Sequence, residues 1–526
     1  PTRAYNADGL AMIHRLRGTT WGENFDPNHF LFGVMLDAII SLGHLLGLAS
    51  SNATEVFIAQ AVLSLAGVAA LFALRAWLQE SGVSTEARCV ALGIAGSTFV
   101  FWRFATDVDM YVVLTLCWIQ ALRFSWRWSH SQRPWELVVA ACWGSLGALT
   151  HQLGILILIP IAGVIAAAPE LTSADRRMAW GRVLLSGTLV LGGPYCYVAE
   201  VLYRGTPFEG LRNFVFNPDA TGSGFDWACV RFAGHPLEWV RQVALGHWNL
   251  SWFCDDDAVF YAFRNASGHP LFDNLFWRLA VPMAWGVATL LGYRWLARQI
   301  RVEGTEQQRW QWIQLTRWNW IPLFVFLVLL SPAFAYYRLL YWPAQLLLLA
   351  LAWDAGGRSA RQILIGIVVA QLGWNLTLGI IPQSRLGHEP HYAAITAWST
   401  RLHDGDLLIA TSAIDPMLMQ YLRAFLGVQR ININSSPVVV IPASIAERPA
   451  FATLTSDTLT TVFSHIYLDS QTAEVFLKQG RLTFAYRVMP SYALRKITLD
   501  GQAWQLGARI QDPALPVDLV ELVPTR

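Results

Sequence analysis

The stretch TEVFIAQAVLSLAGVAALFALRAW, residues 54–77, decides the fold class of this chain. It is apolar almost throughout, and its two charged residues, Glu55 and Arg75, lie close to its ends. A helix of about 20 mainly apolar residues crosses the hydrocarbon core of a bilayer, which is about 30 Å thick. We therefore expect residues 54–77 to form a transmembrane helix.

The whole chain has the composition of an integral membrane protein. Of its 526 residues, 54% are hydrophobic and only 14% are charged, which is more apolar than a soluble protein of this length. The net charge of +2 gives no reason to expect a nucleic-acid partner. Similar apolar runs predict ten transmembrane helices in all, at 54–77, 88–104, 110–128, 136–150, 153–169, 180–202, 276–297, 318–334, 338–354 and 362–382.

The segment 29–50 is apolar but carries Asp37 and His44, which are costly inside hydrocarbon, so we interpret it as an interfacial helix. The chain begins at Pro1, and the expected sidedness requires one more transmembrane helix upstream of it.

Arginines alternate along the predicted loops. They cluster in the connections that follow the helices ending near 77, 128, 169, 297 and 354, whereas the alternate short connections hold only Arg103 and Arg338. Basic loops stay in the cytoplasm. The connections 104–110 and 150–153, the long loop 203–275 and the tail from about 383 are therefore predicted outside the cytoplasm, and the protein in a bacterial inner membrane.

This pattern predicts three regions: a first external loop at 1–53, a transmembrane domain at 54–382 and a small external domain at 383–526. Within the last, DLLIAT, PVVVIPA and VFSHIYLD are short β-branched runs separated by helical and turn-like pieces, which is typical of an α/β or α+β module. No C-x-x-C pair is present, and whether Cys229 and Cys254 form a disulfide in the long loop stays open.

Asp8, in YNADGLAMIHRLRG (residues 5–18), is the first candidate for a reactive group. It precedes an amphipathic segment, so helix capping explains it as well as catalysis does. His29, in NFDPNHFLFG, opens the interfacial segment and is open to a structural or a binding role.

Asp107 and Asp109 share the short external turn in FWRFATDVDMYVV. Acids are favoured at a helix N-terminus by its dipole, yet so short a turn also holds them near lipid head groups. His151, in LTHQLGI, interrupts a long apolar stretch, which favours a polar cavity. Arg338, in SPAFAYYRLLYWP, suits a bidentate contact with a phosphate or a position at the interface among tyrosines.

Taken together, these motifs resemble the GT-C superfamily of membrane glycosyltransferases, which includes protein O-mannosyltransferases and lipid A aminoarabinose transferases. The resemblance rests on the acid in NADG, the segment PNHFLFG, the turn ATDVD, the long external loop and the external C-terminal domain, and it covers most of the chain. The first helix of the family is missing from this sequence.

The resemblance implies a sugar donor linked to polyprenyl phosphate and an acceptor hydroxyl on a protein, a lipid or a glycan, transferred with inversion. It implies Asp8 as general base, Asp107 or Asp109 as the group that orients the acceptor or a divalent cation, and Arg338 with His151 as the groups that neutralise the leaving phosphate. No cofactor is certain from the sequence, and a divalent cation stays open. The alternatives are a membrane scaffold with the same fold and, less favoured, a transporter.

Overall fold

The computed structural model describes residues 7–16, 30–168, 171–197, 291–292, 294–330, 339–384, 395–396, 399, 401–403, 406–410, 421–426, 429–432, 439–441, 459, 463–488, 493–511 and 518–525. The chain divides into two compact units. One comprises 1–25, 33–62 and 384–526, and the other comprises 26–32 and 63–383.

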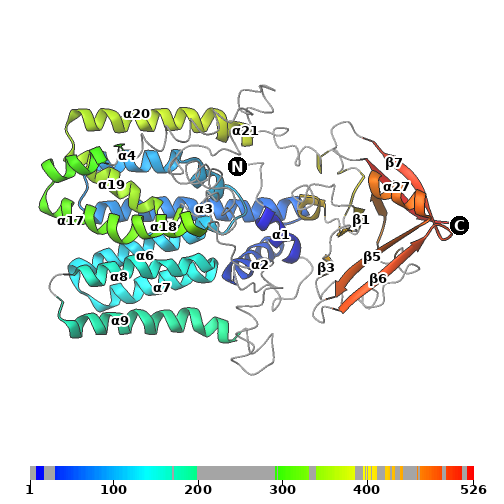
Figure 1. Ribbon diagram of the computed structural model, residues 1–526, viewed down its shortest axis with the longest axis horizontal. Helices are drawn as coiled ribbons and strands as arrows, with labels where there is room; N and C mark the ends of the chain where they lie inside the picture. The colour runs from blue at the N-terminus through cyan, green and yellow to red at the C-terminus, as the bar shows by residue number, and fades with distance from the viewer. Residues whose placement is uncertain are drawn as a thin grey trace. The chain divides into compact units, whose positions relative to one another are not determined.

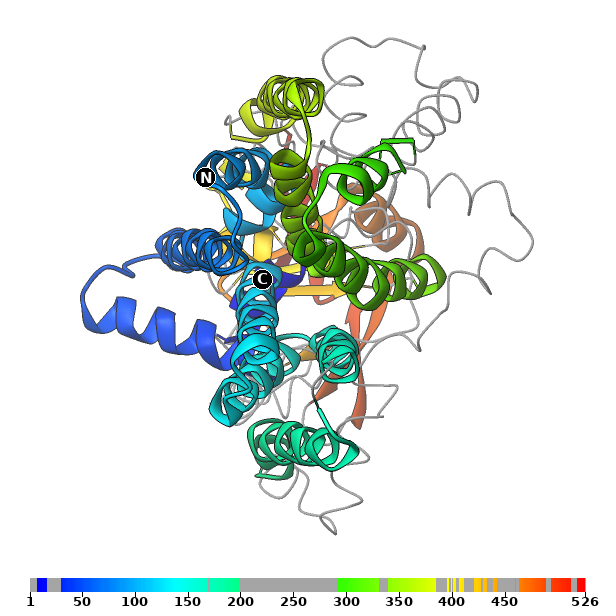
Figure 2. The same cartoon turned by 90° about the vertical axis from the view of Figure 1, so that its left-hand side faces the viewer.

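The second unit is built from helices that run side by side with their axes roughly parallel (Figure 1), as is also evident when one looks along them (Figure 2). In chain order the helices are α3 (Asn52–Glu80, which starts in the first unit), α4 (Thr85–Ser97), α5 (Phe99–Ala105), α6 (Tyr111–Ser131), α7 (Pro134–Thr150), η2 (Gln152–Ile157), α8 (Leu158–Ala167), α9 (Ser173–Gly187), η3 (Thr188–Gly192), α17 (Glu306–Leu315), η6 (Thr316–Trp320), α18 (Ile321–Leu330), α19 (Trp342–Ala355), α20 (Arg358–Trp374), η8 (Asn375–Ile380) and α21 (Ile381–Ser384).

Each span predicted from hydropathy overlaps one or more of these helices, except 276–297, most of which lies outside the described residues. Within the described part of the chain, α3 alone is both long and apolar enough for a complete crossing, while 30–45 and 152–167 are shorter apolar helices. Several predicted spans fall short because the helix changes type or breaks within them, as at Thr98 between α4 and α5.

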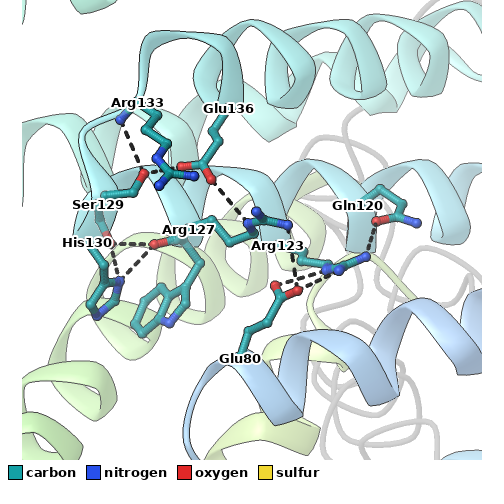
Figure 3. A network of polar contacts seen from close by, with 10 residues as sticks. Glu80, Gln120, Arg123, Arg127, Ser129, His130, Arg133 and Glu136 are labelled. Carbon is teal, nitrogen blue, oxygen red and sulfur yellow. Dashed lines mark hydrogen bonds and ion pairs between the residues drawn. The ribbon is translucent and has the colours of Figure 1, made fainter.

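An ion network, defined here as Glu80, Arg123, Arg127 and Glu136, joins the C-terminal ends of α3 and α6 to the start of α7 (Figure 3). Both nitrogens of the Arg123 fork bind Glu80, with Nε donating to Oε2 at 2.9 Å. Arg127 Nε donates to Glu136 Oε1 at 3.2 Å, and Ser131 Oγ donates to Glu136 Oε2. The network therefore ties three helices together at one end of the unit.

The first unit contains α1 (Ala7–Leu16), whose buried Leu10 and Ile13 lie on one face, and α2 (Phe30–Leu45), which starts in the second unit. Helix α1 packs against η9 (Leu422–Leu426) within this unit. The helix predicted near 29–50 is present, and its position at a membrane interface stays a prediction.

Two sheets follow in the C-terminal part, as the β-rich runs predicted. Strands β1 (Leu407–Ala410), β2 (Gln429–Asn432), β4 (Ile466–Asp469), β7 (Trp504–Ile510) and β8 (Leu519–Pro524) form a sheet in the order β2-β1-β4-β8-β7, and β3 (Val439–Ile441), β5 (Arg481–Val488) and β6 (Ala493–Asp500) form another in the order β3-β5-β6.

Strand β1 is parallel to β2 and β4, while β8 is antiparallel to both its neighbours. Helix α27 (Ser470–Gln479) is capped by Asp469, which accepts from Thr472 N at 2.6 Å, and ends at Gly480 with φ of 66°. A positive φ costs glycine little. The mixture of parallel and antiparallel strands agrees with the expected α/β or α+β module.

Candidate functional site

Residues 106–110, between α5 and α6, form a turn that we call the acid turn. It contains Asp107 and Asp109, the two carboxylates that the sequence analysis proposed as candidate site residues. The side chains of Asp107 and Asp109 are both completely buried. Val108 N–H donates to Asp107 Oδ1 at 2.7 Å, and Tyr111 N–H donates to Asp109 Oδ1 at 3.2 Å. Each carboxylate therefore accepts from a nearby backbone amide, Asp107 from one within the turn and Asp109 from the first residue of α6.

Asp109 also serves α6. Its carboxylate binds the amide of Tyr111, the first residue of that helix, where the helix has no partner of its own for an N–H group. The acid lies at the positive end of the helix dipole. Asp109 can therefore serve as a helix cap or as a reactive group, the two roles that the sequence analysis left open.

Arg103 is the cation of the site. Its Nη2 lies 3.5 Å from Asp107 Oδ2, and it precedes Asp107 by four residues, so α5 and the start of the turn place the two on one side. The guanidinium retains about a fifth of its exposure while the carboxylate has none. Removing this charge would leave a buried carboxylate with weaker compensation, which is costly.

His151 contributes a second buried group at the same end of α6. It is only 4% exposed, and its Nδ1 accepts from Leu153 N–H at 3.1 Å. A ring nitrogen that accepts a backbone N–H carries no proton, so the proton of the neutral ring is on Nε2. That nitrogen lies 3.5 Å from Tyr111 Oη, to which it can donate.

Close packing sets the position of both halves of the site. A Cβ on Gly154 would lie 2.4 Å from backbone atoms of residues 147 and 148, so only glycine permits the tight turn from α7 into η2 that carries His151. Similarly, a Cβ on Gly67 would lie 2.7 Å from the Ala105 side chain, so α3 approaches the end of α5 closely. The ring of Phe104 meets that of Tyr111 edge to face, with centroids 5.4 Å apart.

Of the residues chosen from the sequence, the structure thus joins Asp109 and His151 through Tyr111, and Asp107 lies in the same turn as Asp109. Asp8 is the second residue of α1 and does not precede it, and its side chain lies outside what the structure describes. His29 and Arg338 lie outside the described residues. Their predicted roles stay predictions.

Sequence reasoning missed two members of the site. Arg103 was noted only as a rare basic residue on its side, although its spacing of four from Asp107 indicates an ion pair along a helix. Tyr111 was missed because an aromatic residue at the start of an apolar helix is ordinary, and its partner His151 is 40 residues away.

A divalent cation was left open by the sequence. Among the residues that the structure describes, no group of three or more His, Cys, Asp or Glu side chains is arranged to hold a metal ion. The carboxylates of Asp107 and Asp109 are oxygen ligands of the kind that Mg²⁺ binds.

Comparison with known proteins found no matching family model and no matching curated protein. Among solved structures, the chain is similar to ArnT from Cupriavidus metallidurans bound to undecaprenyl phosphate, with a TM-score of 0.49 and 14% identity over 93% of this chain and 87% of that one. It is also similar to ArnT from the same organism in the apo state, with a TM-score of 0.41 and 12% identity over 99% and 93% of the two chains. At this level of similarity, the resemblance to the GT-C superfamily expected from the sequence stays a prediction.

Proposed function

We propose that this protein is a membrane-embedded glycosyltransferase that moves a sugar from a polyprenyl-phosphate donor to an acceptor hydroxyl outside the cytoplasm. The observation that carries the proposal is the buried acid turn, in which Asp107 and Asp109 lie beside Arg103 and the Tyr111–His151 pair. It combines acids that can orient a hydroxyl with groups that can stabilise an anion.

Membrane embedding is supported by apolar side chains that the helical unit leaves exposed. On α3, Leu65, Val68 and Phe72 are exposed at helical spacing, with exposed fractions of 67%, 49% and 62%. The same is true of α20, where Ile365, Val369 and Leu372 are exposed, and of Leu376 in η8, which follows it. Large exposed apolar faces on several helices mark contact with lipid or another protein.

The two polar ends of the unit fit the same interpretation. Helix α6 has 21 residues, which at 1.5 Å each is about 30 Å, the thickness of the hydrocarbon core. The acid turn lies at one end of this helix and the ion network at the other. We assign the acid turn to the extracytoplasmic side because its connection is poor in basic residues, and place the C-terminal domain on that side as well.

The reaction forms a bond between the acceptor oxygen and the anomeric carbon and breaks the bond from that carbon to the phosphate oxygen. The acceptor oxygen attacks the face opposite the leaving phosphate, which inverts the anomeric carbon. As general base, Asp8 accepts the proton of the acceptor hydroxyl, and Asp107 or Asp109 orients the acceptor. Arg338 and the Tyr111–His151 pair stabilise the phosphate as it leaves. In this proposal Tyr111 Oη, which lies 3.5 Å from His151 Nε2, donates to a phosphate oxygen.

A non-catalytic scaffold is the second candidate, and one observation favours it. Both carboxylates of the acid turn bind amides of their own backbone, as they would in a purely structural turn. A scaffold would tolerate loss of either carboxylate as long as the turn kept its shape.

The first test is binding of undecaprenyl phosphate to the purified full chain, measured as a rise in unfolding temperature with lipid concentration. We expect saturable stabilisation, because a ligand that binds only the folded state raises its stability. Tyr111→Phe keeps the ring and removes the hydroxyl, so it should weaken binding. Trp135→Phe serves as the control, because the Trp135 ring lies against Arg127 of the ion network and not at the acid turn. Absence of stabilisation at any lipid concentration would exclude this donor class.

A further inference from the structure

The helix is interrupted between α4 and α5, and the backbone carbonyls at this break accept hydrogen bonds from another part of the chain. Thr98 is extended, with φ of −67° and ψ of 120°, between two helical stretches. Its amide donates to Ala95 O, three residues back, at 3.2 Å. The last carbonyls of a helix lack partners within it and need other donors.

Two amide side chains of the α20 region provide them. Gln371 Nε2 donates to Ile94 O at 2.9 Å, where Thr98 Oγ1 also donates at 2.8 Å. Asn375 Nδ2 donates to Ser97 O at 2.6 Å. Inside an apolar environment, exposed carbonyls at a break are tolerated only when such partners exist.

Gln371 and Asn375 are four residues apart, so they share one helical face, and both are fully buried. Leu372 and Leu376 lie on the exposed side of the same stretch. Asn375 also begins the π-helix η8, a distortion that often accompanies a functional position.

Thr98 is held from a third direction. Trp342 Nε1, at the start of α19, donates to Thr98 Oγ1 at 3.3 Å, and its ring stacks on that of Phe101 in α5 with centroids 4.8 Å apart. Elements from α4, α19 and α20 therefore converge on this one residue. The direction in which α5 leaves the break is fixed by them.

That direction matters because α5 is short and leads directly into the acid turn. Its seven residues span about 10 Å, so a change of about 20° at Thr98 would move its far end by about 3–4 Å. Arg103 lies near that end, with Asp107 just beyond. A misplacement of about 1 Å is already enough to reduce catalysis strongly.

We propose that Gln371 and Asn375 are positioning residues: by satisfying the carbonyls at the Thr98 break, they aim α5 and so place Arg103 and the acid turn for reaction. The inference rests on the proposed function for the role of the turn. The geometric part, that these amides hold the turn in place, can be tested without any assay of transfer.

The geometric test uses a single thiol at Val108, a position that is completely buried in the acid turn. In a full-length protein with its native cysteines replaced, Val108→Cys should be protected from thiol reagents. Adding Gln371→Leu or Asn375→Leu should raise its labelling rate at least tenfold, whereas Leu372→Ala and Leu376→Ala, on the exposed side of the same stretch, should leave it protected. Thr98→Val, which keeps the side-chain shape and removes the hydroxyl, should act like the amide variants and provides a milder change if those fail to fold.

The second readout is the rate of sugar transfer, for which we expect kcat to fall at least tenfold while KM for the donor changes little. Protection of Cys at 108 in all folded variants would overturn the inference. Increased labelling with unchanged kcat would also overturn it, because the amides would then hold the turn without serving the reaction. If the parent protein shows no transfer, the proposed function fails, and the labelling still decides whether the amides hold the turn.

Discussion

Helix α6 carries a polar cluster at each end, and the two are built differently. At its C-terminal end, the ion network binds side chain to side chain across α3, α6 and α7 (Figure 3). At its N-terminal end, Asp107 and Asp109 accept from backbone amides one and two residues further on, and Asp107 also pairs with Arg103, four residues earlier. The network holds helices together, whereas the turn holds its own shape.

The two clusters also differ in how much of each charge is exposed. Glu80, Arg123 and Arg127 keep part of their exposure, while Glu136 is buried against Arg127. Arg127 also lies over the rings of Phe124 and Trp135 at 5.4 and 5.6 Å. Both carboxylates of the acid turn are completely buried. Burying a carboxylate is unfavourable, so a turn that retains two of them points to chemistry, and a partly exposed network of matched charges points to assembly.

The largest expected effect separates the two clusters by activity. Asp107→Asn and Asp109→Asn should each lower the transfer rate by at least about 100-fold, the size typical of losing an acid–base or orienting group. Folding should be retained because asparagine keeps the shape and one oxygen that accepts the backbone amide. Transfer from a radiolabelled lipid-linked sugar measures the rate, and Glu136→Gln in the ion network is the control that should keep it. Normal transfer in both aspartate variants would remove these two acids from the mechanism.

Substitutions in the ion network should instead lower the stability of the protein and leave transfer unchanged. Glu136→Gln should lower the free energy of unfolding by about 2–3 kcal/mol, less than for a completely buried pair because Arg127 is partly exposed. Thermal unfolding measures the change. Replacing both partners, as Glu136→Leu with Arg127→Met, should recover most of it, since no charge is then left without a partner. If the double variant is no more stable than the single one, the pair is not what holds α6 to α7.

The contrast explains what could be predicted from the sequence. Hydropathy located the helices, and the crowded acids in ATDVD located the turn, because both are local patterns. The sequence could not pair Tyr111 with His151, or Arg123 with Glu80, because contacts between residues some 40 positions apart leave no periodic signal. Arg123 and Arg127 were interpreted only as markers of the cytoplasmic side, and the structure shows that they also bind Glu80 and Glu136.

A smaller effect is expected where α19 meets α4 at the same end of the unit as the ion network. Asp354 Oδ2 accepts from Ser84 N–H at 2.8 Å, and Asp354 Oδ1 accepts from Ser84 Oγ at 2.5 Å. Asp354→Asn should cost about 1 kcal/mol, because one charge-assisted bond becomes neutral and one acceptor becomes a donor. Thermal unfolding compared with Ser84→Ala and with the double variant gives the coupling of the pair. A coupling of zero would show that this contact does not fasten the helices.

The smallest effect is a local dependence on pH at the start of α9. Thr172 Oγ1 donates to Asp175 Oδ2 at 2.6 Å, and Thr172 N–H donates to the same oxygen at 3.2 Å. These hydrogen bonds, with a further contribution from Arg182, lower the pKa of Asp175 below its ordinary value. A lowered pKa means that the unfolded segment binds the proton first as the pH falls.

The stabilisation from this cap is therefore complete above the ordinary pKa of an aspartate, about 4, and is lost as the pH falls through the lower folded value. Hydrogen exchange of the amides at 173–176 should accelerate in acid relative to those in the middle of α9, and Asp175→Asn should remove the pH dependence. Hydrogen exchange of the amides in the acid turn is the control for this measurement. Faster exchange at 173–176 alone would show that the cap opens by itself while the functional end of α6 stays intact. Simultaneous acceleration at both places would instead mean that the two ends of the helical unit open together, and that the division between an assembling end and a reacting end is wrong.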